Sequence, residues 1–478
     1  MKNILPILIT LVITIGLLAP IGVQSTPGQE DQSLEAPDLL DLSRVENSHL
    51  APCFDALSAN YQVDQTANTL TSFEIRPFVF VSDQRSTSKI LMGVGTSTVD
   101  HISLDASKIV NWFDNTPVIL RDDGMDPDER ANDRLFTGNL RLANPPTQAS
   151  SVQVIRNLTF TLHLKNGRVQ EVTEDVASSI GVINTLRNVP VTSVASNVFR
   201  TSNVVNIVRQ NLLEGTYPLI GINFFTAAQT FYRNFPDQFD WLVFFHIYNG
   251  RGSPAGSYTQ VSNSIQGIGQ QIINRANEYG SRGRLRGIIS LFFKHAAPMS
   301  HEIFHTWGVY GFGALGLASS VGGGGHWGAL ANATNHTVFG FPLTLRSLTR
   351  TANGNFCGPW GSGPILGLEL YLMGLAPASE IGIYQYVVDS AFVGFNCNGY
   401  EFSGSRIATL DQNAVITAFG PRVPAHPDQS DFRAAVIVVS NRALVPAEWD
   451  YVSRWFEDHA STFPRDFAGR ARISYQLQ

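Results

Sequence analysis

Two kinds of hydrophobic pattern divide the chain after residue 68. Between residues 69 and 176, short apolar runs are separated by turn residues at the spacing expected for a β-sandwich. The strands that this pattern predicts cover residues 73–81, 117–120, 135–142, 152–164 and 168–172. Residues 177–200 are rich in Val, Ser, Thr and Asn without a clear period, which predicts a linker.

Helical and strand signals alternate from residue 201 to residue 478. Helical spacing covers 203–213, 225–235 and 268–279, and Gly280 follows the last of these as a natural stop. Residues 240–248 are a continuous apolar run of strand length, typical of the interior of a sheet, and 285–293 predict a further strand. This order predicts an α+β domain in which helices pack on a sheet.

The N-terminus predicts export. Lys2 precedes an apolar run over residues 4–23, and the small residues that follow suit cleavage after Ser25. The alternative is a retained membrane anchor, because the run is long enough to span a bilayer. Residues 1–25 are therefore expected to be a signal peptide and 26–68 a linker or partly ordered arm. We expect a secreted protein with no membrane association after cleavage.

Composition narrows the function classes. The net charge is −6 and the chain has no long basic run, so nothing favours a nucleic-acid partner. Only 15% of the residues are charged, and 41 Gly and 24 Pro fit a loop-rich extracellular protein. In an oxidising compartment Cys357 and Cys397 are plausible disulfide partners, which leaves Cys53 unpaired. No feature of the sequence indicates an oligomeric state.

The strongest chemical signal is an HExxH motif, His301-Glu302-Ile303-Phe304-His305, between Pro298 and Gly308. Pro fits the first turn of a helix and Gly its end, so the motif is expected on a short helix of about ten residues. Side chains four apart share a helix face, so both imidazoles can reach one metal ion, and Glu302 can approach a water bound to it. A third ligand would complete a hydrolytic zinc site.

The third ligand is less clearly indicated. The metzincin pattern would put a His six residues after the second motif His, where this chain has Gly311. Glu369 is a lone acid within the apolar helical segment 365–374, so it is expected either to meet a metal or to face solvent. His326 follows four glycines and is the alternative ligand, an oxyanion donor or a plain loop residue. Tyr371 is a further candidate donor to an oxyanion or substrate.

The loop Asp122–Asp133 is a possible calcium site. Its five Asp residues supply the oxygen ligands that Ca²⁺ prefers, and the loop resembles one that recurs in immunoglobulin-like domains of exported bacterial proteins. The alternative is a solvated loop built from Asx turns, because the spacing is not that of an EF-hand.

Three segments together resemble a family of poorly characterised exported bacterial proteins that are similar to zincin metallopeptidases. They are the motif with Thr-Trp-Gly after it, the Gly-Gly-His-Trp segment around His326, and Leu-Glu-Leu-Tyr-Leu-Met-Gly-Leu-Ala-Pro around Glu369. The likeness spans about residues 218–478. It implies a zincin-like domain over 201–478, with His301 and His305 as zinc ligands, Glu302 as the base and a gluzincin-like third ligand.

The function expected from these features is zinc-dependent hydrolysis of peptide bonds, with a protein or peptide as substrate. A metal-dependent esterase or glycan-directed hydrolase would use the same residues. The other alternative is an extracellular binding or adhesion protein with a structural or inactive zinc site. Glu302 favours an enzyme, because a structural zinc site needs ligands but no base.

Overall fold

The computed structural model describes most of the chain after residue 69. The described ranges are 70–84, 86–113, 116–146, 150–214, 221–247, 256–292, 299–308, 315, 348–359, 367–394, 397 and 399–477. The predicted signal peptide, the 26–68 arm, Cys53 and His326 lie outside them. Across these ranges, no helix has the length and apolar character needed to cross a membrane.

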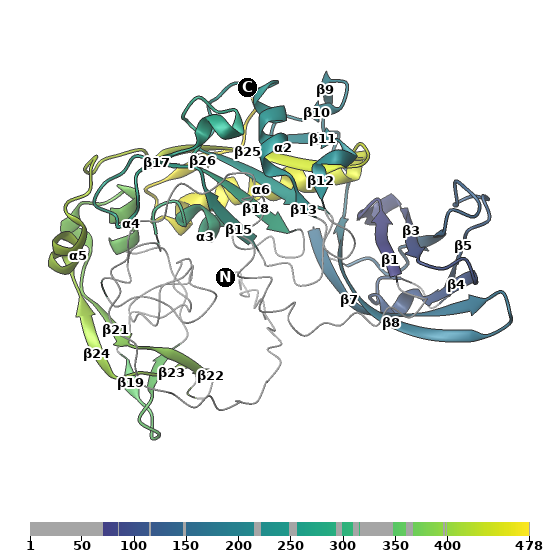
Figure 1. Cartoon of the computed structure of the whole chain (residues 1–478), viewed down its shortest axis with the longest axis horizontal. Coiled ribbons are helices and arrows are strands. Elements are labelled where there is room, and N and C mark those ends of the chain that lie inside the picture. The colour runs from purple at the N-terminus through teal and green to yellow at the C-terminus, as the bar shows by residue number, and fades with distance from the viewer. Residues whose placement is uncertain are drawn as a thin grey trace, which may run out of the picture. The chain divides into compact units, whose positions relative to one another are not determined.

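The fold is mixed α+β and rich in strands (Figure 1). The first eight strands form one sheet in the order β1-β3-β6-β5-β4-β7-β8-β2. All neighbours are antiparallel except β2 and β8. The strands are β1 (Leu70–Arg76), β2 (Val79–Val81), β3 (Thr87–Val94), β4 (Val99–Asp105), β5 (Pro117–Arg121), β6 (Leu135–Arg141), β7 (Ser150–Leu164) and β8 (Val169–Ile183).

This sheet encloses a core of its own, consistent with the predicted β-sandwich. Phe80, Ile102, Leu120 and Leu162 are all fully buried in it. The strands predicted over 117–120, 135–142, 152–164 and 168–172 correspond to β5, β6, β7 and the start of β8. The single strand predicted over 73–81 was wrong, because this segment forms β1 and β2, which lie at opposite ends of the sheet order. The sequence pattern did not reveal β3 and β4. The strand β8 also continues to Ile183, past the boundary predicted at residue 176.

A second sheet organises the rest of the chain, in the order β15-β18-β14-β25-β11-β10-β9, with β26 paired to β25. Its central strands are parallel. The edge strands β15 and β9 are antiparallel to their neighbours, and β10 is antiparallel to both β11 and β9. The strands are β9 (Thr192–Ala195), β10 (Val198–Arg200), β11 (Val204–Val208), β14 (Trp241–His246), β15 (Gly256–Gln260), β18 (Gly287–Phe292), β25 (Asp431–Ser440) and β26 (Arg472–Ser474).

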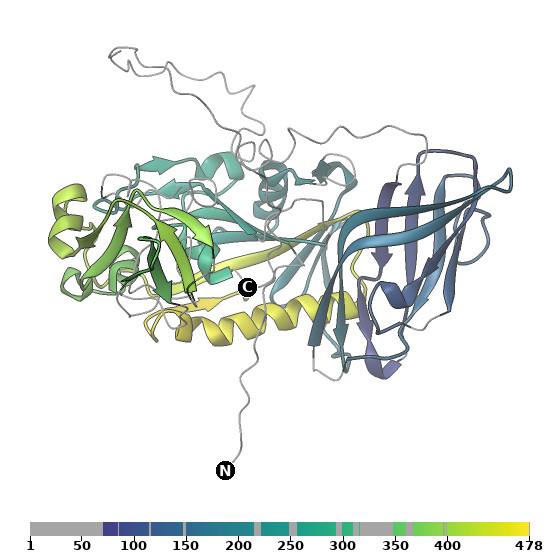
Figure 2. The same ribbon diagram turned by 90° about the horizontal axis from the view of Figure 1, so that it is seen from below.

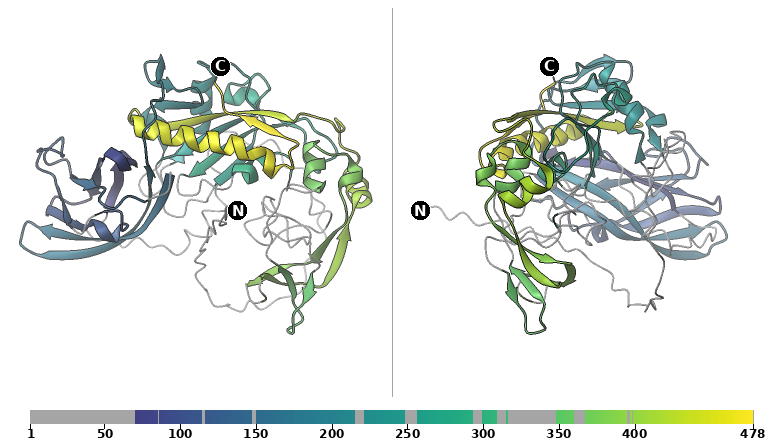
Figure 3. Two further views of the ribbon diagram at one scale, coloured as in Figure 1. Left: turned by 180° about the vertical axis from the view of Figure 1, so that it is seen from behind. Right: turned by 60° about the vertical axis from the view of Figure 1, so that its left-hand side comes forward.

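Helices cover both faces of this sheet. Alternate side chains of β14 enter two cores, with Val243 in one and Phe244 in the other. This is why residues 240–248 form a continuous apolar run. The helix α2 (Phe224–Tyr232) lies on the Phe244 side, and α3 (Met299–Phe304), α4 (Gly367–Met373) and α6 (Pro446–Asp466) contribute to the Val243 core (Figures 2 and 3). The described residues also form the helix α5 (Gln412–Phe419).

Three predictions for this region were wrong. The predicted helix 203–213 is the strand β11 followed by a 3-10 turn, since its Val and Ile side chains are buried on both faces of the sheet. The predicted helix 268–279 is a short strand, β17 (Ile273–Asn274), and a 3-10 turn that ends at Gly280. The predicted linker 177–200 contains the end of β8 and the strands β9 and β10.

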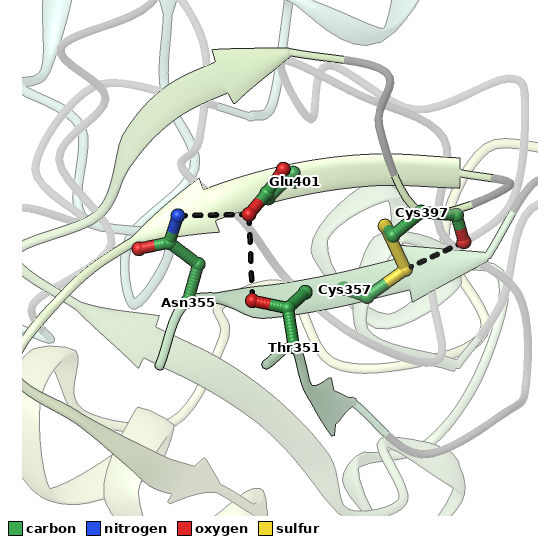
Figure 4. Close-up of a disulfide and its surroundings, with 5 residues drawn as sticks. All are labelled: Thr351, Asn355, Cys357, Cys397 and Glu401. Atoms are coloured by element: carbon green, nitrogen blue, oxygen red, sulfur yellow. Dashed lines mark hydrogen bonds between the residues drawn. A yellow bond between two sulfur atoms is a disulfide. The ribbon is translucent and has the colours of Figure 1, made fainter. Parts of the chain in front are cut away.

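Smaller sheets surround this core. They comprise β12 (Leu213–Glu214), β13 (Gly221–Ile222), β16 (Ser262–Asn263), β17, β19 (Thr349–Arg350), β20 (Phe356–Pro359), β21 (Tyr384–Val388), β22 (Ala391–Gly394), β23 (Gly399–Ser403) and β24 (Arg406–Leu410). The predicted disulfide between Cys357 and Cys397 is confirmed, and Figure 4 shows it beside the buried carboxylate of Glu401. A cavity of about 340 Å³ lies next to it and includes no residue of the HExxH motif.

Candidate metal centre

The first four residues of the HExxH motif lie on α3, which spans Met299–Phe304 within the described residues, and His305 directly follows this helix. Helical hydrogen bonds continue past Phe304, since the His305 amide donates to the His301 carbonyl (3.3 Å) and the Gly308 amide to the Phe304 carbonyl (3.0 Å).

An aromatic cluster fixes α3 on the sheet. The Trp241 indole of β14 donates a hydrogen bond to the Thr306 hydroxyl (2.9 Å) and packs edge-on against Trp307, with 5.8 Å between ring centroids. Phe432 of β25 lies against both indoles. Fully buried aromatic groups on neighbouring strands thus hold the residues that follow the motif, which limits the freedom of a very short helix.

The two motif imidazoles converge. The Nε2 atoms of His301 and His305 lie 3.2 Å apart, with the ring planes at 81°. Two nitrogens about 2.05 Å from one tetrahedral zinc would be separated by about 3.3 Å. The two atoms are also within hydrogen-bond distance of each other, so the same separation suits either a hydrogen bond between the rings or two ligands of one ion.

Glu302 is buried against the edge strand β15. The residue is 5% exposed, and burial raises the pKa of its carboxyl to about 8. Gly256, at the start of β15, lies against this carboxyl, since a Cβ atom there would be 2.7 Å from Oε1 of Glu302. The absence of a side chain at Gly256 therefore makes room for the carboxylate.

The strand β15 continues along the motif with Tyr258. The Tyr258 ring is nearly parallel to that of His305, with the centroids 6.2 Å apart, and its hydroxyl donates to the Arg286 carbonyl (3.3 Å). Sequence reasoning identified neither Gly256 nor Tyr258, because they lie about 45 residues before the motif and have no spacing signal that links them to it.

Glu369 lies on α4, the helix predicted for it, and is 1% exposed, so the alternative that it faces solvent was wrong. Its negative charge adds to burial in raising the pKa of Tyr384, whose hydroxyl accepts a hydrogen bond from the Leu368 amide (2.9 Å). Within the described ranges, no group of three or more His, Cys, Asp or Glu side chains is arranged to hold a metal ion. The structure thus brings His301 and His305 together but does not add Glu369 to them.

Tyr371 is buried, and its hydroxyl accepts the backbone N–H of Arg422 (2.9 Å). The Arg422 guanidinium donates to the carbonyls of Leu372 (2.9 Å) and Met373 (3.2 Å) and to Asp428 (2.7 Å). A buried cation therefore caps the C-terminal end of α4, where carbonyl groups have no helical partner.

The Asp122–Asp133 loop uses its carboxylates to organise its own backbone. Asp122 accepts the amides of Asp133 (3.1 Å) and Arg134 (2.9 Å), and Asp128 accepts those of Gly124 (2.6 Å) and Arg130 (3.3 Å). Of these contacts, the one between Asp128 and Arg130 has the spacing of an Asx turn. Asp123 and Asp133 make two more such turns, by accepting the amides of Met125 (2.9 Å) and Leu135 (2.9 Å).

Comparison of the chain with protein-family models, with curated proteins and with solved structures gives no match. The case for a function therefore depends on the chemistry of the residues described above.

Proposed function

We propose that the chain is a secreted zinc metallopeptidase, with a zincin-like domain that follows an immunoglobulin-like β-sandwich module. The observation that carries this proposal is the 3.2 Å separation of the His301 and His305 Nε2 atoms, next to the buried carboxylate of Glu302. Two imidazoles at the separation of two zinc ligands, together with a buried acid, support hydrolysis by a zinc-bound water. Either Glu369, which this structure does not place with the two imidazoles, or His326 would supply the third protein ligand.

Each residue of the proposed site has its own role in hydrolysis. Zinc, when bound, lowers the pKa of a coordinated water and polarises the carbonyl that is attacked. His301 and His305 would hold the ion through Nε2, and Glu302 would accept the proton of the attacking water at its carboxylate. Burial raises the pKa of Glu302, so its carboxylate takes up this proton readily, and the proton then goes to the leaving amine, which is the stronger base. His326 or Tyr371 would donate to the developing oxyanion.

The edge strand supports a peptide as the substrate. β15 is the last strand of its sheet, and its outer edge has no strand partner within the described ranges. An extended peptide can add to such an edge through main-chain hydrogen bonds. Gly256 and Tyr258 lie on this strand and contact the motif, so a peptide added to β15 would lie next to Glu302.

Metal analysis combined with Glu302→Gln tests the proposal. The purified chain should hold about one zinc ion, and it should cleave members of a broad peptide library. Glu302→Gln should keep the zinc and abolish cleavage. Comparing Glu369→Ala with His326→Ala identifies the third ligand by zinc loss. Zinc retention without hydrolysis of any peptide would favour an extracellular binding or adhesion protein with an inactive site.

A further inference from the structure

A chain of four polar side chains connects α3 to the C-terminal part of the molecule. The Tyr475 hydroxyl lies 2.8 Å from His459 Nδ1, His459 Nε2 lies 3.2 Å from Ser300 Oγ, and Ser300 Oγ lies 2.7 Å from Asp466 Oδ2. Ser300 belongs to the first turn of α3 and directly precedes His301. His459 and Asp466 belong to α6, and Tyr475 follows β26.

The chain lies in a dry environment. Ser300, Asp466 and Tyr475 are all buried, and the rings of Trp455 and Phe463 pack against the half-buried His459. Water therefore competes little for these hydrogen bonds, and each is worth more than a similar contact at the surface.

The order of donors and acceptors follows from the groups themselves. An ionised carboxylate only accepts, so Ser300 donates its single proton to Asp466. His459 Nε2 must then carry the proton that reaches Ser300 Oγ, and Nδ1 accepts from Tyr475. Burial lowers the pKa of His459 to about 4 and raises that of Tyr475, so the imidazole and the phenol are both neutral near pH 7. The four groups therefore form one directed series from Tyr475 to Asp466.

We propose that Ser300, His459 and Asp466 are positioning residues that fix the rotation of α3, so that the His301 and His305 imidazoles converge. The described part of α3 is six residues long, and an isolated helix of a few turns has little stability of its own. The aromatic cluster holds its C-terminal side, and the directed series holds its first turn. This inference deepens the proposed zinc site, but its structural part does not depend on zinc.

The test uses Ser300→Ala in the full chain, with Ser290→Ala as the matched control. Ser290 is also buried and its hydroxyl lies 2.8 Å from a histidine, His246, which packs against Phe224 of the helix α2. Two quantities are measured for each variant. The first is the amide hydrogen exchange rate of residues 299–308 in metal-free protein, and the second is the dissociation constant for zinc, measured by chelator competition.

Ser300→Ala should speed exchange of the α3 amides and weaken zinc binding, each about tenfold or more, as expected for loss of a hydrogen bond to a buried charge. Ser290→Ala should change neither. Ser300→Thr, which keeps the hydroxyl, should restore both. Nitrogen-15 spectra of the parent chain should show His459 as the Nε2–H tautomer.

Unchanged exchange in Ser300→Ala would overturn the positioning role, whatever the metal result. Equal effects of Ser300→Ala and Ser290→Ala on α3 exchange would also overturn it. If the parent chain binds no zinc while Ser300→Ala still frees the α3 amides, the positioning role stands and the proposed function fails.

Discussion

Replacing Glu302 by Gln should stabilise the metal-free protein. Burial raises the pKa of Glu302 from 4.5 to about 8, so the folded chain binds a proton that the unfolded chain releases between these values. The wild type therefore loses stability as pH rises from 4.5 to 8, whereas the Gln variant does not. At 1.36 kcal/mol per pKa unit, the advantage of Glu302→Gln is about 3 kcal/mol at pH 7 and about 5 kcal/mol above pH 8.

The assay is urea unfolding of chelator-treated protein, followed by tryptophan fluorescence at pH 5, 7 and 8.5. Glu171→Gln, at an exposed position on β8, is the control for a simple change of charge and should alter stability little. An advantage of Glu302→Gln that is the same at all three pH values would refute the reasoning, because it would show that the carboxyl is not desolvated. Saturating zinc should remove the advantage, since a nearby cation favours the carboxylate.

Further predictions concern positions around the site. Serine at both Cys357 and Cys397 should lower the free energy of unfolding by about 4 kcal/mol, because the disulfide closes a loop of 40 residues; urea titration of the oxidised chain and the variant measures this. Gly256→Ala should displace the Glu302 carboxylate and lower peptidase activity by about a hundredfold while zinc is retained. Metal analysis and peptide hydrolysis distinguish this result from loss of the metal. Arg422→Met should lower the free energy of unfolding by about 3–5 kcal/mol, since it leaves a partly buried carboxylate without its cation. Full retention of the thermal midpoint would contradict the predicted role of this residue as a cap.

Local sequence patterns predicted the structure correctly where a few neighbouring residues determine it. The motif helix, the strand β14 and the disulfide are of this kind, because turn residues, an apolar run and a pair of cysteines carry the information. The prediction failed at β11, where Val and Ile fit both helical and strand periods. Pairing of β11 with β25, more than 200 residues later in the chain, determines the outcome there.

The residues that surround the site could not be predicted from the hydrophobic pattern, because their contacts also join distant parts of the sequence. Ser300 contacts residues that are 159 and 166 positions away, and no periodicity connects them. The contact between Gly256 and Glu302 likewise exists only because an edge strand lies against α3. Sequence reasoning thus found the residues with characteristic chemistry and missed those that shape their pocket.

The helix α6 has a consequence for how the protein can be shortened. Its first turns carry the buried carboxylates of Glu448, which accepts the Phe78 amide, and Asp450, which binds Arg187. Its far end, about 30 Å away, holds Ser300. A fragment that begins near residue 201 would lack Phe78 of the preceding sheet and Arg187, which follows that sheet. Glu448 and Asp450 would keep their ion pairs with Arg442 and Arg454 but lose these contacts, at one end of the helix whose other end contacts α3. We therefore expect that assays of the proposed site need the longer chain.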